Sequence, residues 1–398
     1  MQRILAFLML FSTALLAACA GAPDRPGSVK TPTVVQARPE IRPAPEVEVS
    51  SLNRVAPPAA ASVASPLQPL AALPAASGNA HIALLLPLKS PFFGRAAEVV
   101  RQGFMAGASI QPGALPVTVY SSNDETDDIV STYRQAMQAG ASVVVGPLTR
   151  NGVSALAASS QVSVPTLALN LPEQNIVFPP KLYVFGLAAD LEARQMARIA
   201  FGEDRKKAVA IASGNTLSKR IQQAFSDEWS ALGGSAGNLF FNGLNSTDVR
   251  DELSRQAPDV LFLAMDSRDA RLLRPFLNND LPTYATSQIY AGSSSLQKYH
   301  DLNGVQFIDM PWLLQPDHLA VMVYPRPEPT VPADMERLYA LGIDAWRLAL
   351  QLQMASPGFT FSLDGVTGQL MLDVRSHQIN REGVRAEFSD GEAILLVP

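Results

Sequence analysis

The chain has 398 residues, of which 47% are hydrophobic and 17% are charged, and its formal net charge at pH 7 is −5. Nucleic-acid-binding surfaces usually require a basic face, so this acidic balance argues against a DNA or RNA partner. The single cysteine excludes an internal disulfide, and stability must therefore come from an ordinary hydrophobic core.

Residues 1–18 have the organisation of a bacterial lipoprotein signal peptide. Arg3 supplies the positive charge, and residues 4–16 form an apolar run that is short for a membrane span but suits a signal peptide. The sequence Leu-Ala-Ala-Cys at 16–19 resembles a lipobox, whose cysteine receives the lipid chains. We therefore expect Cys19 to be lipidated. A short anchor helix that carries an incidental cysteine is the alternative.

The residues after Cys19 predict where the chain resides. Ala20 stands where an aspartate would favour retention at the inner membrane, so the outer membrane is expected, with the chain facing the periplasm. Residues 19–79 contain eleven prolines and many alanines without a helical or strand period. Such a composition predicts a disordered tether between the lipid and a folded domain at 80–398.

From His81 onward, strand patterns alternate with helix patterns. Residues 82–87 form a continuous apolar run, as expected for a strand that is buried on both faces. Further strands are predicted at 116–121, 141–146, 164–169, 208–212, 239–241, 260–264 and 283–285, and helices at 94–109, 127–139 and 217–232. The alternation predicts an α/β fold with doubly wound parallel sheets, and the size of the domain favours two lobes.

The sequence contains no recognisable constellation of an enzyme or a metal site. The four histidines lie far apart, and there is no phosphate-binding Gly-Lys-Ser/Thr loop. Residues 233–237 match the G-x-S-x-G pattern of hydrolases, but a predicted helix precedes them and a strand follows, which reverses the required order. These glycines are expected to end the helix instead. We expect no catalytic activity, metal or cofactor.

Small and polar residues follow several of the predicted strands, at the strand ends that face the ligand crevice in open α/β sheets. As a set they outline a candidate cleft, and they are Lys89, Ser90, Gly146, Pro147, Leu148, Thr149, Asn170, Asp266 and Ser287. The alternative is that each serves a turn or caps a helix. Thr149, Asn215 and Asp266 are all suitable N-cap residues.

Eight collinear motifs make residues 80–398 similar to the LpoA family, the outer-membrane lipoprotein activators of class A penicillin-binding proteins. The motifs are Ile82–Pro91, Val143–Leu148, Leu167–Asn170, Tyr183–Leu187, Asp280–Ser287, Asp309–Leu314, Arg337–Trp346 and Leu363–Leu370. The resemblance implies a type I periplasmic-binding-protein-like fold. It places residues 80–187 and 334–355 in lobe one, and 188–310 and 360–398, including strands near 369–373 and 393–397, in lobe two.

The resemblance also implies a function, namely that the chain binds a class A penicillin-binding protein and stimulates peptidoglycan synthesis. Larger family members carry a tetratricopeptide-like helical domain. Residues 21–79 show no helical period, so we do not expect that domain in this segment. The alternative is a periplasmic receptor that binds an amino acid or a cell-wall fragment between its lobes. Outer-membrane anchoring fits poorly with such a receptor, because its transporter lies in the inner membrane.

The segment 310–332 is rich in proline, which excludes a central strand or a long helix there. One hypothesis is that part of it is exposed and contacts the synthase through Trp312, Tyr324 and Arg326, since stiff loops with aromatic and arginine anchors lose little entropy on binding. The other hypothesis is that its apolar residues simply cover the connection between the lobes.

Overall fold

A computed structural model describes residues 79–174, 176–293, 298–354 and 359–396. The predicted signal peptide, Cys19 and the proline-rich segment up to residue 78 lie outside the described residues. Within the described part, no helix is both long enough and apolar enough to span a membrane.

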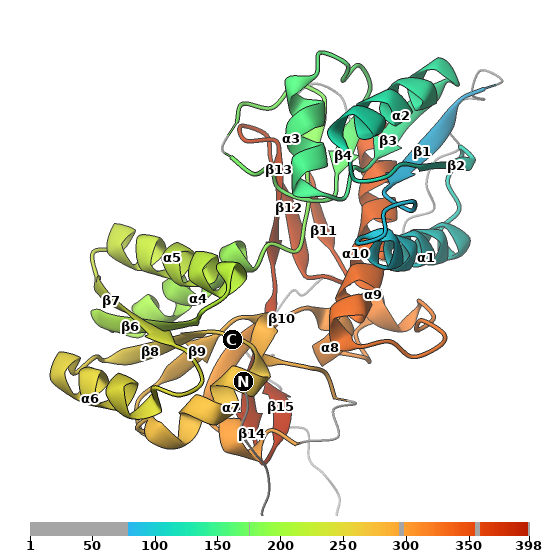
Figure 1. The fold of residues 1–398 in the computed structure, drawn as a ribbon. Helices are drawn as coiled ribbons and strands as arrows, with labels where there is room; N and C mark the ends of the chain where they lie inside the picture. The colour runs from blue at the N-terminus through green and yellow to red at the C-terminus, as the bar shows by residue number, and fades with distance from the viewer. Residues whose placement is uncertain (1–78, 175, 294–297, 355–358, 397–398) are drawn as a thin grey trace, which may run out of the picture. The chain divides into compact units, whose positions relative to one another are not determined.

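The first sheet contains eight strands in the described part of the chain, in the order β11-β12-β13-β5-β4-β3-β1-β2 (Figure 1). They are β1 (His81–Leu86), β2 (Val117–Ser121), β3 (Ala141–Val145), β4 (Thr166–Ala168), β5 (Leu182–Val184), β11 (Ser362–Asp364), β12 (Gln369–Asp373) and β13 (Gln378–Glu382). Strands β1 to β5 pair in parallel, whereas β11, β12 and β13 pair antiparallel with one another.

The second sheet has the order β15-β14-β10-β9-β8-β6-β7 among the described residues. Its strands are β6 (Lys207–Ser213), β7 (Ser235–Phe241), β8 (Val260–Ala264), β9 (Thr283–Ala285), β10 (Val305–Asp309), β14 (Val384–Ser389) and β15 (Glu392–Leu395). The chain passes between the sheets after β5, after β10 and between β13 and β14. The two-lobed α/β prediction is confirmed, with the refinement that both sheets are mixed.

Helices connect the strands of each sheet (Figure 1). The first lobe has α1 (Gly94–Ile110), α2 (Thr126–Gln138), α3 (Arg150–Ala158) and α10 (Ala333–Gln353); the second has α4 (Ala189–Gly202), α5 (Thr216–Ala231), α6 (Ser246–Gln256) and α7 (Ser267–Leu273). Short helices are η1 (Arg274–Phe276), η2 (Ser287–Ile289), η3 (His300–Leu302), α8 (Pro311–Leu314) and α9 (Leu319–Met322). The predicted helices agree with α1, α2 and α5 to within one residue at each end.

Helices α1 and α10 pack closely side by side and carry much of the first core (Figure 1). Gly103 and Gly342 lie at their contact, where a Cβ on Gly103 would stand 1.9 Å from the Tyr339 carbonyl oxygen. The Trp346 side chain is buried beside them, and its Nε1 donates to the Gln111 carbonyl oxygen at 2.9 Å. The small residues therefore let α10, which lies far along the chain, join the first lobe.

The predicted placement of residues 360–398 in lobe two is wrong for their first half. Strands β11, β12 and β13 extend the first sheet, and only β14 and β15 belong to the second. The alternating burial of β12 and β13 explains this, because Leu370, Leu372 and Ile379 pack into the first core. Phe388 on β14 packs into the second core, so the chain changes sheets at Gly383.

The turn after α5 behaves as its glycines predict. Gly233 has a φ of +92°, which suits glycine at a helix C-terminus, and its N–H donates to the Ser230 carbonyl oxygen. Strand β7 begins at Ser235, earlier than predicted, so this serine lies in a strand that follows a helix. The local order is the reverse of a hydrolase nucleophile turn.

Candidate functional site: a pocket in the first lobe

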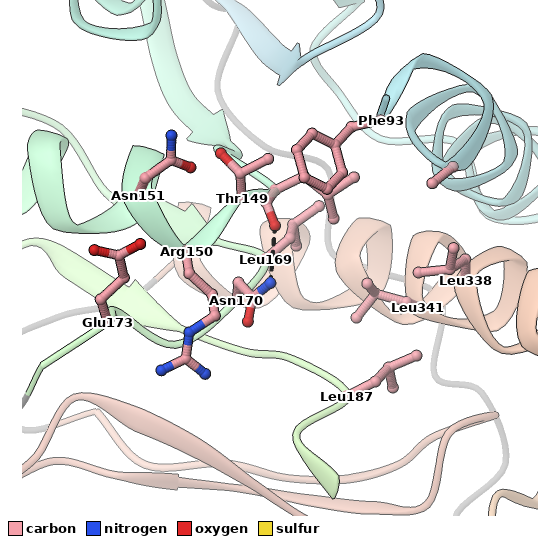
Figure 2. A pocket seen from close by; sticks show the side chains of 12 residues that line it. Phe93, Thr149, Arg150, Asn151, Leu169, Asn170, Glu173, Leu187, Leu338 and Leu341 are labelled. Carbon is pink, nitrogen blue, oxygen red and sulfur yellow. Dashed lines mark hydrogen bonds between the residues drawn. The ribbon is translucent and has the colours of Figure 1, made fainter. Parts of the chain in front are cut away.

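A cavity of about 580 Å³ opens at the carboxyl ends of β3 and β4. Its walls come from the β1–α1 loop, the start of α3, the segments after β4 and β5, and the side of α10 (Figure 2). The lining residues are Phe93, Ala96, Leu148, Thr149, Arg150, Asn151, Leu169, Asn170, Glu173, Leu187, Leu338 and Leu341.

The polar wall is built around the N-terminus of α3. Thr149 is the N-cap residue in backbone conformation, but its side chain makes no capping hydrogen bond, and its buried Oγ1 has no partner among the described residues. Arg150 Nη2 donates to the Pro172 carbonyl oxygen at 2.8 Å. Asn170 Nδ2 donates to the Leu148 carbonyl oxygen at 3.0 Å, which ties the two strand ends together (Figure 2).

The opposite wall is apolar. Leu338 and Leu341 project from α10, and Leu187 approaches from the segment after β5 (Figure 2). Phe93 is 43% exposed at the rim, and its neighbour Phe92 is 82% exposed. Two adjacent exposed aromatic side chains beside a hollow are a common feature of binding surfaces.

The arrangement suits binding and offers no recognisable chemistry. The helix N-terminus and Arg150 would favour a carboxylate or another polar group, and the leucines would favour an apolar one. Neither histidine nor cysteine lines the pocket. In the described ranges, no group of three or more His, Cys, Asp or Glu side chains is placed to hold a metal ion.

Only part of the predicted cleft lies in this pocket. Leu148, Thr149 and Asn170 line it. The lining residues that sequence reasoning missed include Phe93, Arg150, Leu187, Leu338 and Leu341. In the sequence, the adjacent pair Phe92–Phe93 after the first strand could have indicated a binding surface. No sequence pattern indicates that the leucines of α10 line the pocket.

The remaining cleft candidates in the first lobe shape its loops. Lys89 is exposed, and Ser90 Oγ accepts hydrogen bonds from the Phe92 and Phe93 N–H groups. Gly146 has a φ of +113° and precedes Pro147, and a Cβ there would stand 1.9 Å from the Leu85 carbonyl oxygen. These residues serve turns, as the alternative interpretation proposed.

The two candidates in the second lobe do not reach the pocket. Asp266 caps α7, with its Oδ1 accepting from the Asp269 N–H at 2.9 Å. Ser287 is buried, and its backbone N–H donates to Glu192 Oε2 at 3.0 Å. The pocket therefore contains none of the second-lobe candidates, and a cleft that joins all nine residues stays a prediction.

The proposed aromatic anchors of segment 310–332 are buried. Trp312 is 0% exposed and Tyr324 8%, and both pack against α10 in one cluster. Arg326 lies over the Trp312 ring at 4.1 Å from its centroid and pairs with Glu336 at 3.2 Å. The prediction that both aromatic rings face a partner is thus wrong, because the short helices α8 and α9 fold them inward.

Comparison with known proteins places the chain among lipoproteins. The profile of the family described as "LppC putative lipoprotein" matches residues 53–253 and 240–391. The "Penicillin-binding protein activator LpoA" of Vibrio cholerae (serotype O1, strain M66-2) is 28% identical over 332 residues, which cover 74% of this chain and 54% of that protein. The chain spans about half the length of the curated relatives it matches.

Two solved structures extend this comparison. The "LpoA (YraM) C-domain from Haemophilus influenzae, a regulator of PBP1A" is 25% identical, with a TM-score of 0.69, and the match covers 80% of this chain and 100% of that one. The other is described as "Structure of a putative branched-chain amino acid ABC transporter from Chromobacterium violaceum ATCC 12472". It is 38% identical with a TM-score of 0.67, over 77% of this chain and 99% of that one.

Proposed function

The chain belongs to the LppC family of lipoproteins, and from this premise we propose that it is an anchored activator of a class A penicillin-binding protein. The observation that carries the proposal is the match of the described lobes to the whole LpoA C-domain, which is described as a regulator of PBP1A. Curated relatives named penicillin-binding protein activators support the same function.

The proposed mechanism is a shift in the synthase's conformational equilibrium. An activator without catalytic groups raises an enzyme's rate only if it binds the active conformation more tightly than the inactive one. A coupling free energy of about 1–3 kcal/mol corresponds to about a 5- to 150-fold change in equilibrium. A moderate surface contact on the lobes is sufficient for that, so no chemistry from this chain is required.

The proposed location follows from lipidation. Lipid attached to Cys19 would hold the chain at the outer membrane, with both lobes in the periplasm. The family description as a lipoprotein supports the anchor. The synthase would then meet the chain from the opposite, inner membrane.

A second candidate function is a solute receptor. It is favoured by the pocket, which combines a polar wall at α3 with leucines from α10, and by the similarity to the Chromobacterium violaceum structure. The two candidates differ in what must bind, because a receptor needs a small molecule and an activator needs a synthase.

A titration of the full chain in detergent against a purified class A penicillin-binding protein tests the main proposal. We expect saturable binding together with faster glycan polymerisation or peptide crosslinking, and no effect from an unrelated periplasmic binding protein of similar fold. Absence of binding to every class A synthase of the same cell would refute the activator. A screen of amino acids and muropeptides for thermal stabilisation of the chain would then test the receptor.

A further inference from the structure

Helix α10 of the first lobe is tied to the second lobe by a buried arginine. Arg337 Nη2 lies 2.6 Å from Asp309 Oδ2, and its Nε donates to Asp309 Oδ1 at 3.1 Å. The same Nη2 donates to the carbonyl oxygens of Ser287, at 3.0 Å, and Tyr290, at 2.7 Å. Asp309 ends β10 of the second sheet, and Ser287 and Tyr290 lie in one segment at η2, so one guanidinium contacts two segments of the other lobe.

A second buried pair joins the lobes through different elements. Glu192 on α4 pairs with Arg381 on β13, which belongs to the first sheet. The other carboxylate oxygen of Glu192 accepts from the Ser287 N–H at 3.0 Å. Ser287 therefore connects the two ion pairs, because its N–H donates to Glu192 and its carbonyl oxygen accepts from Arg337.

The turn between β11 and β12 links Arg381 to α10 by hydrogen bonds. Arg381 Nη1 donates to the Thr367 carbonyl oxygen at 3.1 Å. Asp344 on α10 accepts from the Val366 N–H at 3.1 Å, the Thr367 N–H at 2.8 Å and Thr367 Oγ1 at 2.7 Å. We call the closed circuit through Glu192, Ser287, Asp309, Arg337, Asp344, Thr367 and Arg381 the buried charge ring.

The ring resists relative movement of the two sheets. All of its members are less than 10% exposed, so a shift that separated either ion pair would leave charges in a site with little access to water. Burial by itself would lower the pKa of Arg337, but the Asp309 carboxylate beside it raises the pKa overall, so the guanidinium stays charged. Replacement of a buried ion pair by apolar residues is often neutral for stability, so the contribution of the ring lies in the geometry that its contacts require.

We propose that the buried charge ring is a clamp that holds the two lobes as one rigid body. The first-lobe pocket then keeps its shape because the second lobe does not move to cover it, and the chain presents a constant surface to any partner. The inference does not rest on the proposed activator function, since a clamp would also restrict a receptor.

Distance measurements between spin labels test the clamp. In a Cys19→Ser chain, labels on cysteines at Gln138 of α2 and Ser254 of α6 would report on the two lobes, because both positions are exposed. We expect a single narrow distance distribution that leucine at 10 mM does not shift. The Glu192→Gln/Arg381→Gln variant should at least double its width. A broad distribution in the unmutated lobes, or a leucine-induced shift, would overturn the clamp.

A matched control separates the ring from ion pairs in general. Asp190 lies on the same helix α4 and pairs with Arg220 of α5 at 2.9 Å, within the second lobe. The Asp190→Asn/Arg220→Gln variant should keep the narrow distribution. Equal widths for the ring variant and the control, with both folded by circular dichroism, would also contradict the clamp.

Hydrogen exchange on the unmodified chain tests the same inference if the ring variant fails to fold. The N–H groups of Ser287, Val366 and Thr367 all donate to carboxylates of the ring. We expect them to exchange as slowly as the central strand β8, since they open only with the ring. Exchange at least a hundred times faster than in β8 would show that the carboxylates of the ring release their backbone donors readily, so that the ring holds no fixed geometry, and would overturn the proposal.

Discussion

Replacement of Arg337 by Met should destabilise the folded chain severely. The substitution keeps an unbranched side chain of similar length but leaves the Asp309 carboxylate, which is 0% exposed, without its cationic partner. Removal of one member of a buried ion pair costs about 3–5 kcal/mol. The carbonyl oxygens of Ser287 and Tyr290 lose a donor as well. Since the free energy of unfolding of a domain is about 5–15 kcal/mol in total, this single change should remove a large part of it.

Urea unfolding followed by circular dichroism and tryptophan fluorescence measures this loss. The matched control is Arg220→Met, whose partner Asp190 is at 2.9 Å but whose side chain is 40% exposed, so its loss should stay below about 1 kcal/mol. The double variant Asp309→Leu/Arg337→Met should recover most of the stability, because no unpaired charge remains. Similar losses for Arg337→Met and Arg220→Met would refute the reasoning from buried charge.

Three further changes follow from the sequence and the structure. Gly103→Ala should lower the free energy of unfolding by about 1–3 kcal/mol in urea melts, because its methyl group would stand 1.9 Å from a carbonyl oxygen of α10; unchanged stability would show that the helices separate easily. Burial alone would raise the pKa of Glu203, but hydrogen bonds from Tyr284 and Arg385 lower it below 4.5, so its stabilisation is present above that pH and is lost as the pH falls. In thermal melts, Glu203→Gln should therefore lose less stability than the unmodified chain as the pH falls below about 4.5. Equal losses of stability in the two proteins would contradict this. Cys19→Ser should move the chain from the membrane to the soluble fraction on cell fractionation, and a variant that stays in the outer membrane would indicate an uncleaved helix.

Local sequence determined most of the regular elements. The apolar runs at 82–87 and 260–264 correspond to β1 and β8, because strands buried on both faces need no polar alternation. Asp266 and Asn215 cap α7 and α5, as their position before each helix predicts. These features depend on neighbours within a few residues, so the sequence is sufficient to place them.

The candidate site was predictable only in part. Residues that follow strands, such as Thr149 and Asn170, were identified because the carboxyl ends of parallel strands meet at one edge. The leucines at 338 and 341 lie more than 150 residues further along the chain, and they reach the pocket only because Gly103 lets α10 pack against α1. No local pattern specifies such a contact.

Sequence by itself thus determined the class of fold, the family resemblance and the alternation of elements, all of which reside in short segments. Tertiary structure decided which sheet each C-terminal strand joins, whether Trp312 faces a partner or the core, and that Arg337 and Arg381 meet carboxylates from the other lobe. Residues 360–383 show the reason. An antiparallel strand can extend either sheet with the same local pattern, and only the packing of Leu370 and Ile379 against the first core selects one.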